Sequence, residues 1–156
     1  MTFFEPSSKD VEISATLLIV HGMAEHSGRY SDFAQFLADN GIAVATYDHL
    51  GHGQTIKTEA DLGFFGEEHP VQSLLKDVIV MADSLKDRHP DVPHFVMGHS
   101  MAHLLCAMYS SIMRIISQAP SSWVPQTPTH WPRFYYLLTS YWPESLQDNR
   151  IQFLPR

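Results

Sequence analysis

Three short apolar runs, separated by segments of helical periodicity, most constrain the fold of this chain. The runs are Ala15–Val20, Ile42–Tyr47 and Val92–Met97. Residues 27–39 and a longer segment that begins at Pro70 lie between them and carry apolar side chains at helical spacing. An alternation of strand, helix, strand, helix and strand predicts βαβ units, and therefore a parallel sheet with right-handed crossovers.

The two helical segments have the start and stop signals of amphipathic helices. Gly41 is a stop signal for the first, and Pro70 is well suited to the first turn of the second. The apolar face of the first helix is expected to hold Tyr30, Phe33, Ala34 and Leu37. The apolar face of the second is expected to hold Val71, Leu74, Leu75, Val78, Ala82 and Leu85.

Each apolar run is followed directly by a cluster of polar residues and glycine. The clusters are His21–Met23, Asp48–Gly53 and Gly98–Met101. The carboxyl ends of parallel strands meet at one edge of an open α/β sheet, where active sites of such sheets lie. The three clusters are therefore expected to form one site on that edge.

The third cluster begins the serine motif G-x-S-x-G, in which a strand turns sharply into a helix and exposes a nucleophile. Gly98 and Ser100 occupy its first and third positions, and Ala102 stands where the last glycine is expected. An isolated serine at such a turn could be a helix cap. The flanking Gly98, His99 and Met101 favour the nucleophile interpretation.

Three motifs give this sequence a family resemblance. They are His21–Tyr30 (HGMAEHSGRY), Tyr47–Thr55 (YDHLGHGQT) and Gly98–Met101 (GHSM). Over about residues 15–101 the chain resembles monoacylglycerol lipases and bacterial lysophospholipases, which belong to the serine aminopeptidase S33 group of α/β-hydrolases. The resemblance implies an incomplete α/β-hydrolase fold of about three central parallel strands, a small lipid-like ester substrate and no cofactor.

The same resemblance implies a serine mechanism through an acyl-enzyme. Ser100 would attack the ester carbonyl, and the backbone N–H groups of Met23 and Met101 would hold the oxyanion. His21 and Gly22 are expected to shape the oxyanion loop rather than to perform chemistry. Choosing a lipid ester over a peptide as substrate rests on the resemblance alone.

Two further groups of polar residues are open to a structural or a functional interpretation. His49 and His52 lie three positions apart, as a metal pair could, but no carboxylate or cysteine cluster joins them. We therefore expect a structural role in the loop and no metal. Glu25, His26 and Arg29 are expected to form a polar network that fixes the first loop.

The residues after Ser100 do not complete a catalytic triad. The family order is serine, acid, histidine, but no Asp or Glu lies between Ser100 and His130, and no histidine follows Glu144 and Asp148. Nothing around His103 or His130 supports either as a base. No triad acid or histidine is identifiable, so we expect the chain to be truncated and inactive as written.

The composition changes after the serine motif. Residues 1–101 hold 15 of the 17 acidic residues, whereas residues 102–156 hold all three tryptophans and six of the ten prolines. Loss of one G from a glycine codon after Met101 would convert the family-like Met-Gly-Ser-Phe into the observed Met-Ala-His-Leu. We therefore divide the chain into an N-terminal α/β-hydrolase part (1–101) and a tail (102–156) hypothesised to be out of frame. Alternatively, a true helix could be formed by Leu104, Leu105, Met108, Ile112, Ile115 and Ile116.

The charge and terminal sequence exclude several classes of protein. The formal net charge of −7 argues against nucleic-acid binding, and the tail has few basic residues, so membrane contact would be at most peripheral. The N-terminus lacks the pattern of a signal peptide, and the single cysteine, Cys106, fits a cytoplasmic location. The alternative to an ester hydrolase is a non-catalytic pseudo-hydrolase that binds acyl chains or a partner.

Overall fold

The computed structural model describes the backbone of residues 1–118 and confirms the predicted alternation of strands and helices. Residues 1–112 form one compact unit, and a second unit begins at Met113, inside the last helix. Residues 119–156, most of the tail hypothesised to be out of frame, lie outside the described part. The elements are β1 (Thr2–Phe4), β2 (Ala15–Val20), η1 (Ser27–Tyr30), α1 (Ser31–Asp39), β3 (Ile42–Tyr47), η2 (Gly53–Thr55), η3 (Glu59–Asp61), α2 (Pro70–Arg88), β4 (His94–Gly98) and α3 (Met101–Gln118).

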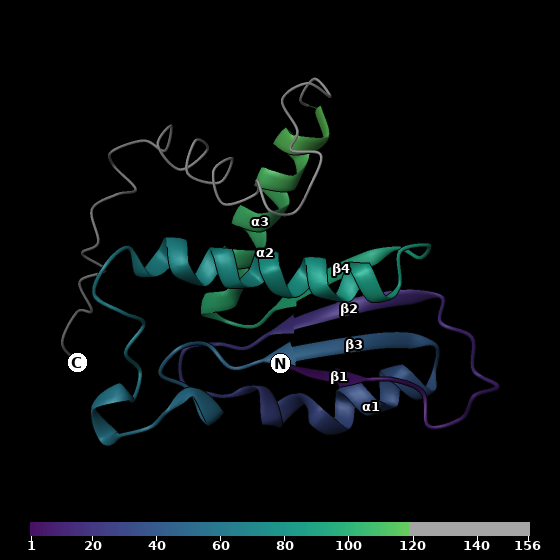
Figure 1. Cartoon of the computed structure of the whole chain (residues 1–156), viewed down its shortest axis with the longest axis horizontal. Helices are drawn as coiled ribbons and strands as arrows, with labels where there is room; N and C mark the ends of the chain where they lie inside the picture. Colours follow the sequence, from purple (N-terminus) through teal and green to yellow (C-terminus); the bar gives the residue numbers. More distant parts are fainter. Residues whose placement is uncertain (119–156) are drawn as a thin grey trace. The chain divides into compact units, whose positions relative to one another are not determined.

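The described strands form a mixed sheet in the order β1-β3-β2-β4 (Figure 1). Strand β2 pairs in parallel with β3 on one side and with β4 on the other, as predicted. The short strand β1 pairs antiparallel with β3 and adds a fourth strand to the three that were expected. Three residues are too few to show the alternation by which a strand is recognised in a sequence.

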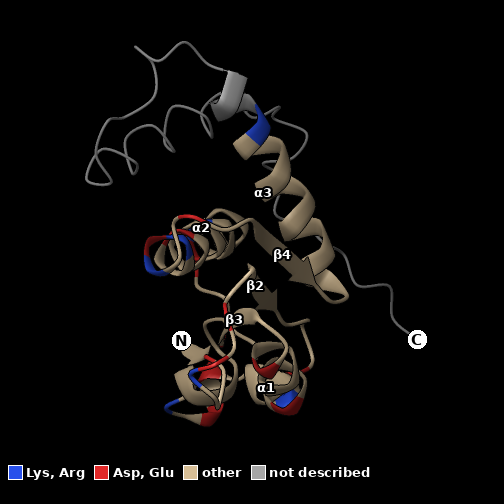
Figure 2. Ribbon diagram, turned by 90° about the vertical axis from the view of Figure 1, so that its right-hand side faces the viewer, with Lys and Arg blue, Asp and Glu red and all other residues tan. Residues whose placement is uncertain are grey.

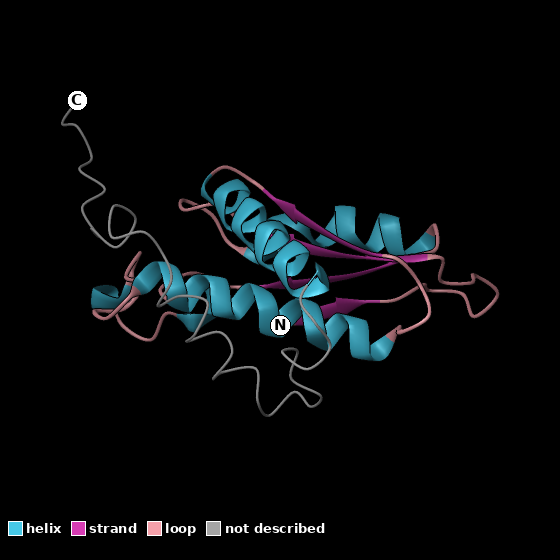
Figure 3. Cartoon of the chain, turned by 90° about the horizontal axis from the view of Figure 1, so that it is seen from above, coloured by secondary structure: helices cyan, strands magenta, loops and turns pink. Residues whose placement is uncertain are grey.

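Helices cover both faces of this sheet (Figures 1 and 3). On one face Ile19 and Val44 pack against Ala34 of α1. On the other face the strands pack against α2 and the first turns of α3, and the buried residues there are Leu18, Val20, Ala45, Tyr47, Leu74, Val78, Ala82, Leu85, Ala102 and Leu105. The strands carry no Asp, Glu, Lys or Arg, and charged side chains lie on the helices and loops (Figure 2).

The helices agree with the predicted faces except at two places. Residues Ser27–Tyr30 form a separate 3₁₀ turn rather than the start of one continuous helix, with Arg29 N–H bonded to His26 O at 3.2 Å. Phe33, predicted on the apolar face of α1, is 44% exposed, and the buried positions of that helix are Ala34 and Ala38. The predicted face of α2 is confirmed, and only Val71 is less than fully buried.

Strand β4 differs from the buried strand that was expected. It lies at the edge of the described sheet, and Phe95 is 57% exposed. Its apolar sequence is typical of a central strand, yet within residues 1–118 it pairs only with β2. The open edge of β4 is therefore an unpaired strand edge of the described unit.

The register places the three carboxyl strand ends side by side. Val20, the last residue of β2, lies opposite both Tyr47 of β3 and Gly98 of β4. The loops that begin at His21, Asp48 and His99 therefore leave the sheet from the same edge. This confirms the predicted meeting point of the three polar clusters.

Candidate functional site

Ser100 sits at a strained turn between β4 and α3. Its φ of 53° lies in the left-handed region, which a serine adopts only when its surroundings hold it there. The residue is exposed, and α3 begins at the next position. This is the geometry of a nucleophile elbow, which was predicted from the motif.

Gly98 allows the strand and the following helix to approach closely at this turn. A Cβ at position 98 would collide with the carbonyl group of Ala102 and lie 2.7 Å from Cys106 Sγ. Ala102 itself is fully buried in the core between the sheet and α3. The core thus accommodates alanine at the position where the motif has its last glycine.

The loop after β2 lies directly against the elbow. A Cβ built on Gly22 would lie 3.1 Å from Ser100 Cβ and 3.1 Å from His99 O. Within residues 1–118, neither Met23 N–H nor Met101 N–H has a hydrogen-bond acceptor. Two free backbone donors thus belong to the two loops that meet at the serine.

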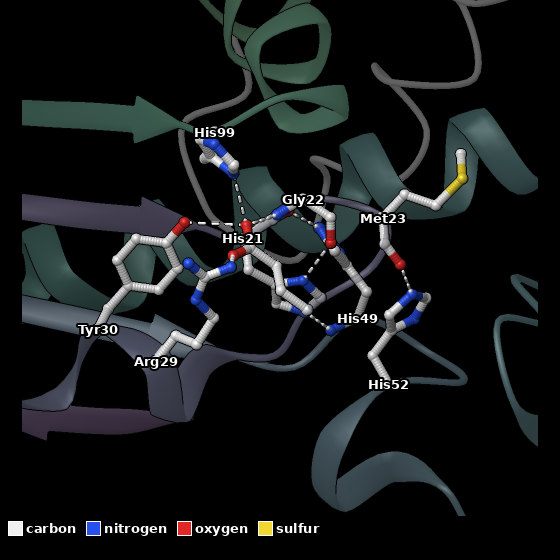
Figure 4. Close-up of polar contacts among 9 residues, drawn as sticks. His21, Gly22, Met23, Arg29, Tyr30, His49, His52 and His99 are labelled. Atoms are coloured by element: carbon white, nitrogen blue, oxygen red, sulfur yellow. Dashed lines mark hydrogen bonds and ion pairs between the residues drawn. The ribbon is translucent and has the colours of Figure 1, made fainter.

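The polar contacts of this loop converge on the carboxylate of Glu25, and Figure 4 labels its partners Gly22, Arg29, Tyr30 and His99. Its Oε1 accepts hydrogen bonds from Gly22 N–H at 2.6 Å, from His99 Nδ1 at 2.8 Å and from Tyr30 OH at 2.9 Å. Its Oε2 accepts a bond from Arg29 Nη1 at 2.9 Å. One carboxylate therefore joins the loop after β2 to the elbow after β4.

These donors also set the charge of the site. Burial alone would raise the pKa of Glu25, but the bonds from Gly22 N–H, His99 and Tyr30 outweigh it and hold that pKa at about 2. Burial and then the nearby carboxylate raise the pKa of Tyr30 to about 12. The predicted network of Glu25 and Arg29 is confirmed, whereas no side chain of residues 1–114 hydrogen-bonds the exposed His26 ring.

Three histidines form a buried cluster behind the first loop. His49 N–H donates to His21 Nε2 at 3.0 Å, so the proton of the neutral His21 ring is on Nδ1, which donates to Gly22 O at 2.7 Å. The two ring nitrogens of His52 lie 2.6 Å from Met23 O and 3.0 Å from Leu50 O. Burial lowers the pKa of His21, and burial followed by the neighbouring His21 lowers that of His49 to about 4.

The contacts of His49 and His52 agree with the structural role expected for them in the loop. The Nε2 atom of His49 lies 3.2 Å from His21 O, and both nitrogens of His52 face carbonyl oxygens. Within residues 1–118, no group of three or more His, Cys, Asp or Glu side chains is arranged to hold a metal ion.

Asp48, which was predicted only as part of the cluster Asp48–Gly53, fixes the second loop. Its carboxylate accepts hydrogen bonds from Ser27 N–H at 2.8 Å and Gln54 N–H at 2.9 Å. Burial alone would raise its pKa, but the bonds from Gln54 and Ser27 outweigh this and lower it. Gly53, with a φ of 50°, leaves the space that this carboxylate fills. The sequence did contain a signal for this role, because the aspartate directly follows an apolar run and precedes a glycine by five residues.

The described residues do not place a general base on Ser100. Its Oγ has no hydrogen-bond partner within residues 1–118, and the neighbouring His99 ring is bonded to Glu25 instead. His103 is exposed on α3. His130, Glu144 and Asp148 lie outside the described residues.

The sequence left two interpretations of the residues after the serine motif, an out-of-frame tail or a true helix. Helix α3 extends through the positions expected for that helix. Leu105 and Ile112 are buried, whereas Leu104 is 62% exposed. None of the helices described, α3 included, is both long and apolar enough to cross a membrane.

Comparison with known proteins relates this geometry to one hydrolase family. A family model described as serine aminopeptidase, S33, matches residues 11–154. A monoglyceride lipase homolog of Monkeypox virus is 37% identical over 87 residues, which are 56% of this chain and 29% of that protein. Monoglyceride lipase of Mus musculus is 36% identical over 87 residues, which are 56% of this chain and 27% of that protein.

A solved structure extends the likeness to three dimensions. The structure of a thermostable carboxyl esterase from Bacillus coagulans, in complex with glycerol, matches 72% of this chain and 35% of that chain. The TM-score is 0.64 and the sequence identity is 27%. The chain thus spans less than a third of the length of either curated relative and about a third of this esterase.

Proposed function

Because this chain belongs to the serine aminopeptidase S33 family of α/β-hydrolases, we propose that it carries the nucleophile and oxyanion-binding part of an ester hydrolase of the monoacylglycerol lipase or lysophospholipase type. The observation that carries the proposal is the contact between two loops. Gly22 abuts the strained Ser100, and each loop contributes a backbone N–H without a partner among the described residues. The proposed substrate is a small lipid-like ester, as the names of the curated relatives suggest.

In the proposed reaction, Ser100 Oγ attacks the ester carbonyl, the alcohol leaves, and water then releases the acid from the acyl-enzyme. Met23 N–H and Met101 N–H stabilise the oxyanion of each tetrahedral intermediate. Such donors act where charge develops, and removal of one from a serine hydrolase costs about 2.7–4 kcal/mol. Met101 begins α3, so the N-terminal dipole of that helix favours the same negative charge.

We propose further that the chain as written does not turn over esters by itself. After Ser100 the sequence contains no acid followed by a histidine, and Ser100 Oγ has no partner in the described residues. The serine proton then has no acceptor, and both proton transfers of the mechanism are lost. General base catalysis of this kind contributes about 10²–10⁴-fold.

The same unpartnered serine favours a second candidate, a non-catalytic pseudo-hydrolase that binds acyl chains or a partner. A fluorophosphonate probe and an ester substrate separate the possibilities. For the purified chain we expect neither Ser100 labelling nor ester turnover above that of S100A. Labelling that S100A abolishes would show that a base reaches Ser100 and would refute the proposed inactivity. Acyl-chain binding by an unlabelled chain would favour the pseudo-hydrolase.

The coding DNA tests whether residues 102–156 are out of frame. If they are, another frame continues Gly-Ser-Phe after Met101 and later encodes an aspartate and then a histidine. Restoring one base is then expected to give ester hydrolysis. If the other frames close within a few codons, the frame hypothesis fails and the pseudo-hydrolase becomes the better account.

A further inference from the structure

We propose that His52 is a positioning residue, which holds the loop after β2 in the form that presents Met23 N–H to the oxyanion. The assignment of that N–H to the oxyanion rests on the proposed function, whereas the contacts of His52 do not. His52 belongs to a different loop, after β3, and its ring is almost completely buried. Figure 4 shows its Nε2 directed at the carbonyl oxygen of Met23.

Two histidine rings hold the backbone on both sides of Met23. His21 Nδ1–H donates to Gly22 O at 2.7 Å, and His52 Nε2 lies 2.6 Å from Met23 O. Gly22 C=O and Met23 N–H belong to one planar peptide group and point in opposite directions. A bond that fixes the direction of the Gly22 carbonyl therefore also fixes the direction of Met23 N–H. With the next carbonyl held as well, neither peptide group that flanks the Met23 Cα can rotate freely.

The His52 ring is itself held firmly. The ring stacks on Phe65 with 4.9 Å between the ring centroids. The backbone N–H of His52 donates to Thr55 Oγ1 at 3.0 Å, and the Thr55 hydroxyl donates to a backbone carbonyl oxygen of the same loop. The donor that reaches Met23 therefore projects from a fixed support and not from a mobile side chain.

The atom that faces Nε2, Met23 O, is a carbonyl oxygen and cannot donate. A hydrogen bond to Met23 O therefore requires a proton on Nε2, whatever the state of Nδ1. The groups that face this ring are His21, His49 and Phe65, with ring centroids 5.3, 6.3 and 4.9 Å away. None of them offers Met23 O an alternative donor. The nitrogens of His21 are engaged with the backbone, and His49 Nε2 donates to His21 O, which leaves the unpartnered His49 Nδ1 without a proton.

Two substitutions separate the donor from the bulk of the ring. In H52Q the side-chain amide can reach the position of Nε2, whereas in H52N the shorter amide can reach only the position of Nδ1. H52N thus keeps a side-chain amide at the position of Nδ1 but loses the bond to Met23 O. H103Q, at an exposed position on α3, is the matched control.

The experiment measures backbone amide exchange by NMR in the full-length chain and the three variants. In H52N we expect the amides of Gly22 and His49, which are bonded to Glu25 and His21, to exchange about tenfold faster, as when an ordinary buried hydrogen bond is lost. H52Q and H103Q should match the wild type, and amides of β2 and β3 should be unchanged throughout.

Three results would overturn the proposal. The first is that the Gly22 and His49 amides exchange equally fast in H52N and in the wild type. The second is that H52Q does not restore slow exchange, and the third is that amide exchange becomes uniformly faster across β2 and β3. If H52N does not fold, the NMR spectrum of the wild type tests the proposal instead. A hydrogen-bonded His52 Nε2–H gives a slowly exchanging imidazole signal, which is assigned to His52 by its loss in H52Q. Absence of that signal refutes the proposal. Fluorophosphonate labelling of Ser100 in the wild-type chain would count only against the proposed inactivity, because the exchange rates of the Gly22 and His49 amides do not depend on Ser100.

Discussion

Replacing Glu25 by glutamine tests whether this carboxylate joins the oxyanion loop to the nucleophile elbow. Glutamine keeps the shape and one acceptor oxygen but removes the charge and turns an NH₂ group toward Arg29. Hydrogen bonds to a charged group contribute about 1.5–3 kcal/mol and those to a neutral group about 0.5–1.5, so each retained bond weakens by about 1 kcal/mol. The bonds from Gly22 N–H and Tyr30 OH are both on Oε1 of a nearly buried side chain.

The expected loss in E25Q is therefore about 2 kcal/mol of unfolding free energy at pH 7, with little from Arg29 and His99, whose side chains are 65% and 61% exposed. The pKa of Glu25 falls from 4.5 to about 2 on folding, so its contribution is complete above pH 4.5 and is lost as the pH falls through 2. The difference between wild type and E25Q should thus shrink across this range.

Urea denaturation at several pH values measures both effects, with E12Q, at an exposed position, as the control. E12Q should unfold like the wild type at every pH. A loss below about 0.5 kcal/mol in E25Q at pH 7, within the range of ordinary surface substitutions, would refute the reasoning. A loss that persists unchanged at the lowest pH would refute the role of the charge.

Two further substitutions test the turn and the histidine cluster. G98A forces a methyl group against the backbone of Ala102, which cannot move aside as a flexible side chain could, so urea denaturation should show a loss of about 3 kcal/mol or more. A loss under about 1 kcal/mol would mean that β4 and α3 are not in close contact. The pKa of His49 is 6.5 in the unfolded chain and about 4 in the folded chain, so between these values only the unfolded chain binds the proton. The contribution of His49 to wild-type stability is therefore complete above pH 6.5 and falls as the pH drops from 6.5 to about 4. H49Q should reduce this fall by about 1–3 kcal/mol, and an identical pH profile in the variant would contradict the account.

The sheet and the edge that carries the site could be predicted because the apolar runs are uninterrupted and each ends in a polar cluster. Ala15–Val20 and Ile42–Tyr47 form strands with the predicted bounds. The third strand was placed correctly, but its exposure was not foreseen, because a sequence of central-strand character does not show which partner is present. Phe95 is exposed because β4 lies at the edge of the described sheet.

The site was predictable in its motifs and less so in its contacts. Ser100 was identified from the serine motif, and Gly22 and Glu25 were identified from the resemblance of the first motif to a known family. The bond from His99 to Glu25 joins residues 74 positions apart and depends on the exact register of β2 and β4. Sequence periodicity fixes which strands pair far better than which side chains meet beyond their ends.

A chimera tests most directly whether residues 1–101 carry a working nucleophile and oxyanion site. These residues would be joined to the part of mouse monoglyceride lipase that follows its 87 aligned residues, and ester hydrolysis would be measured with and without S100A. The account predicts hydrolysis that S100A abolishes. A folded chimera whose hydrolysis does not depend on Ser100 would contradict it.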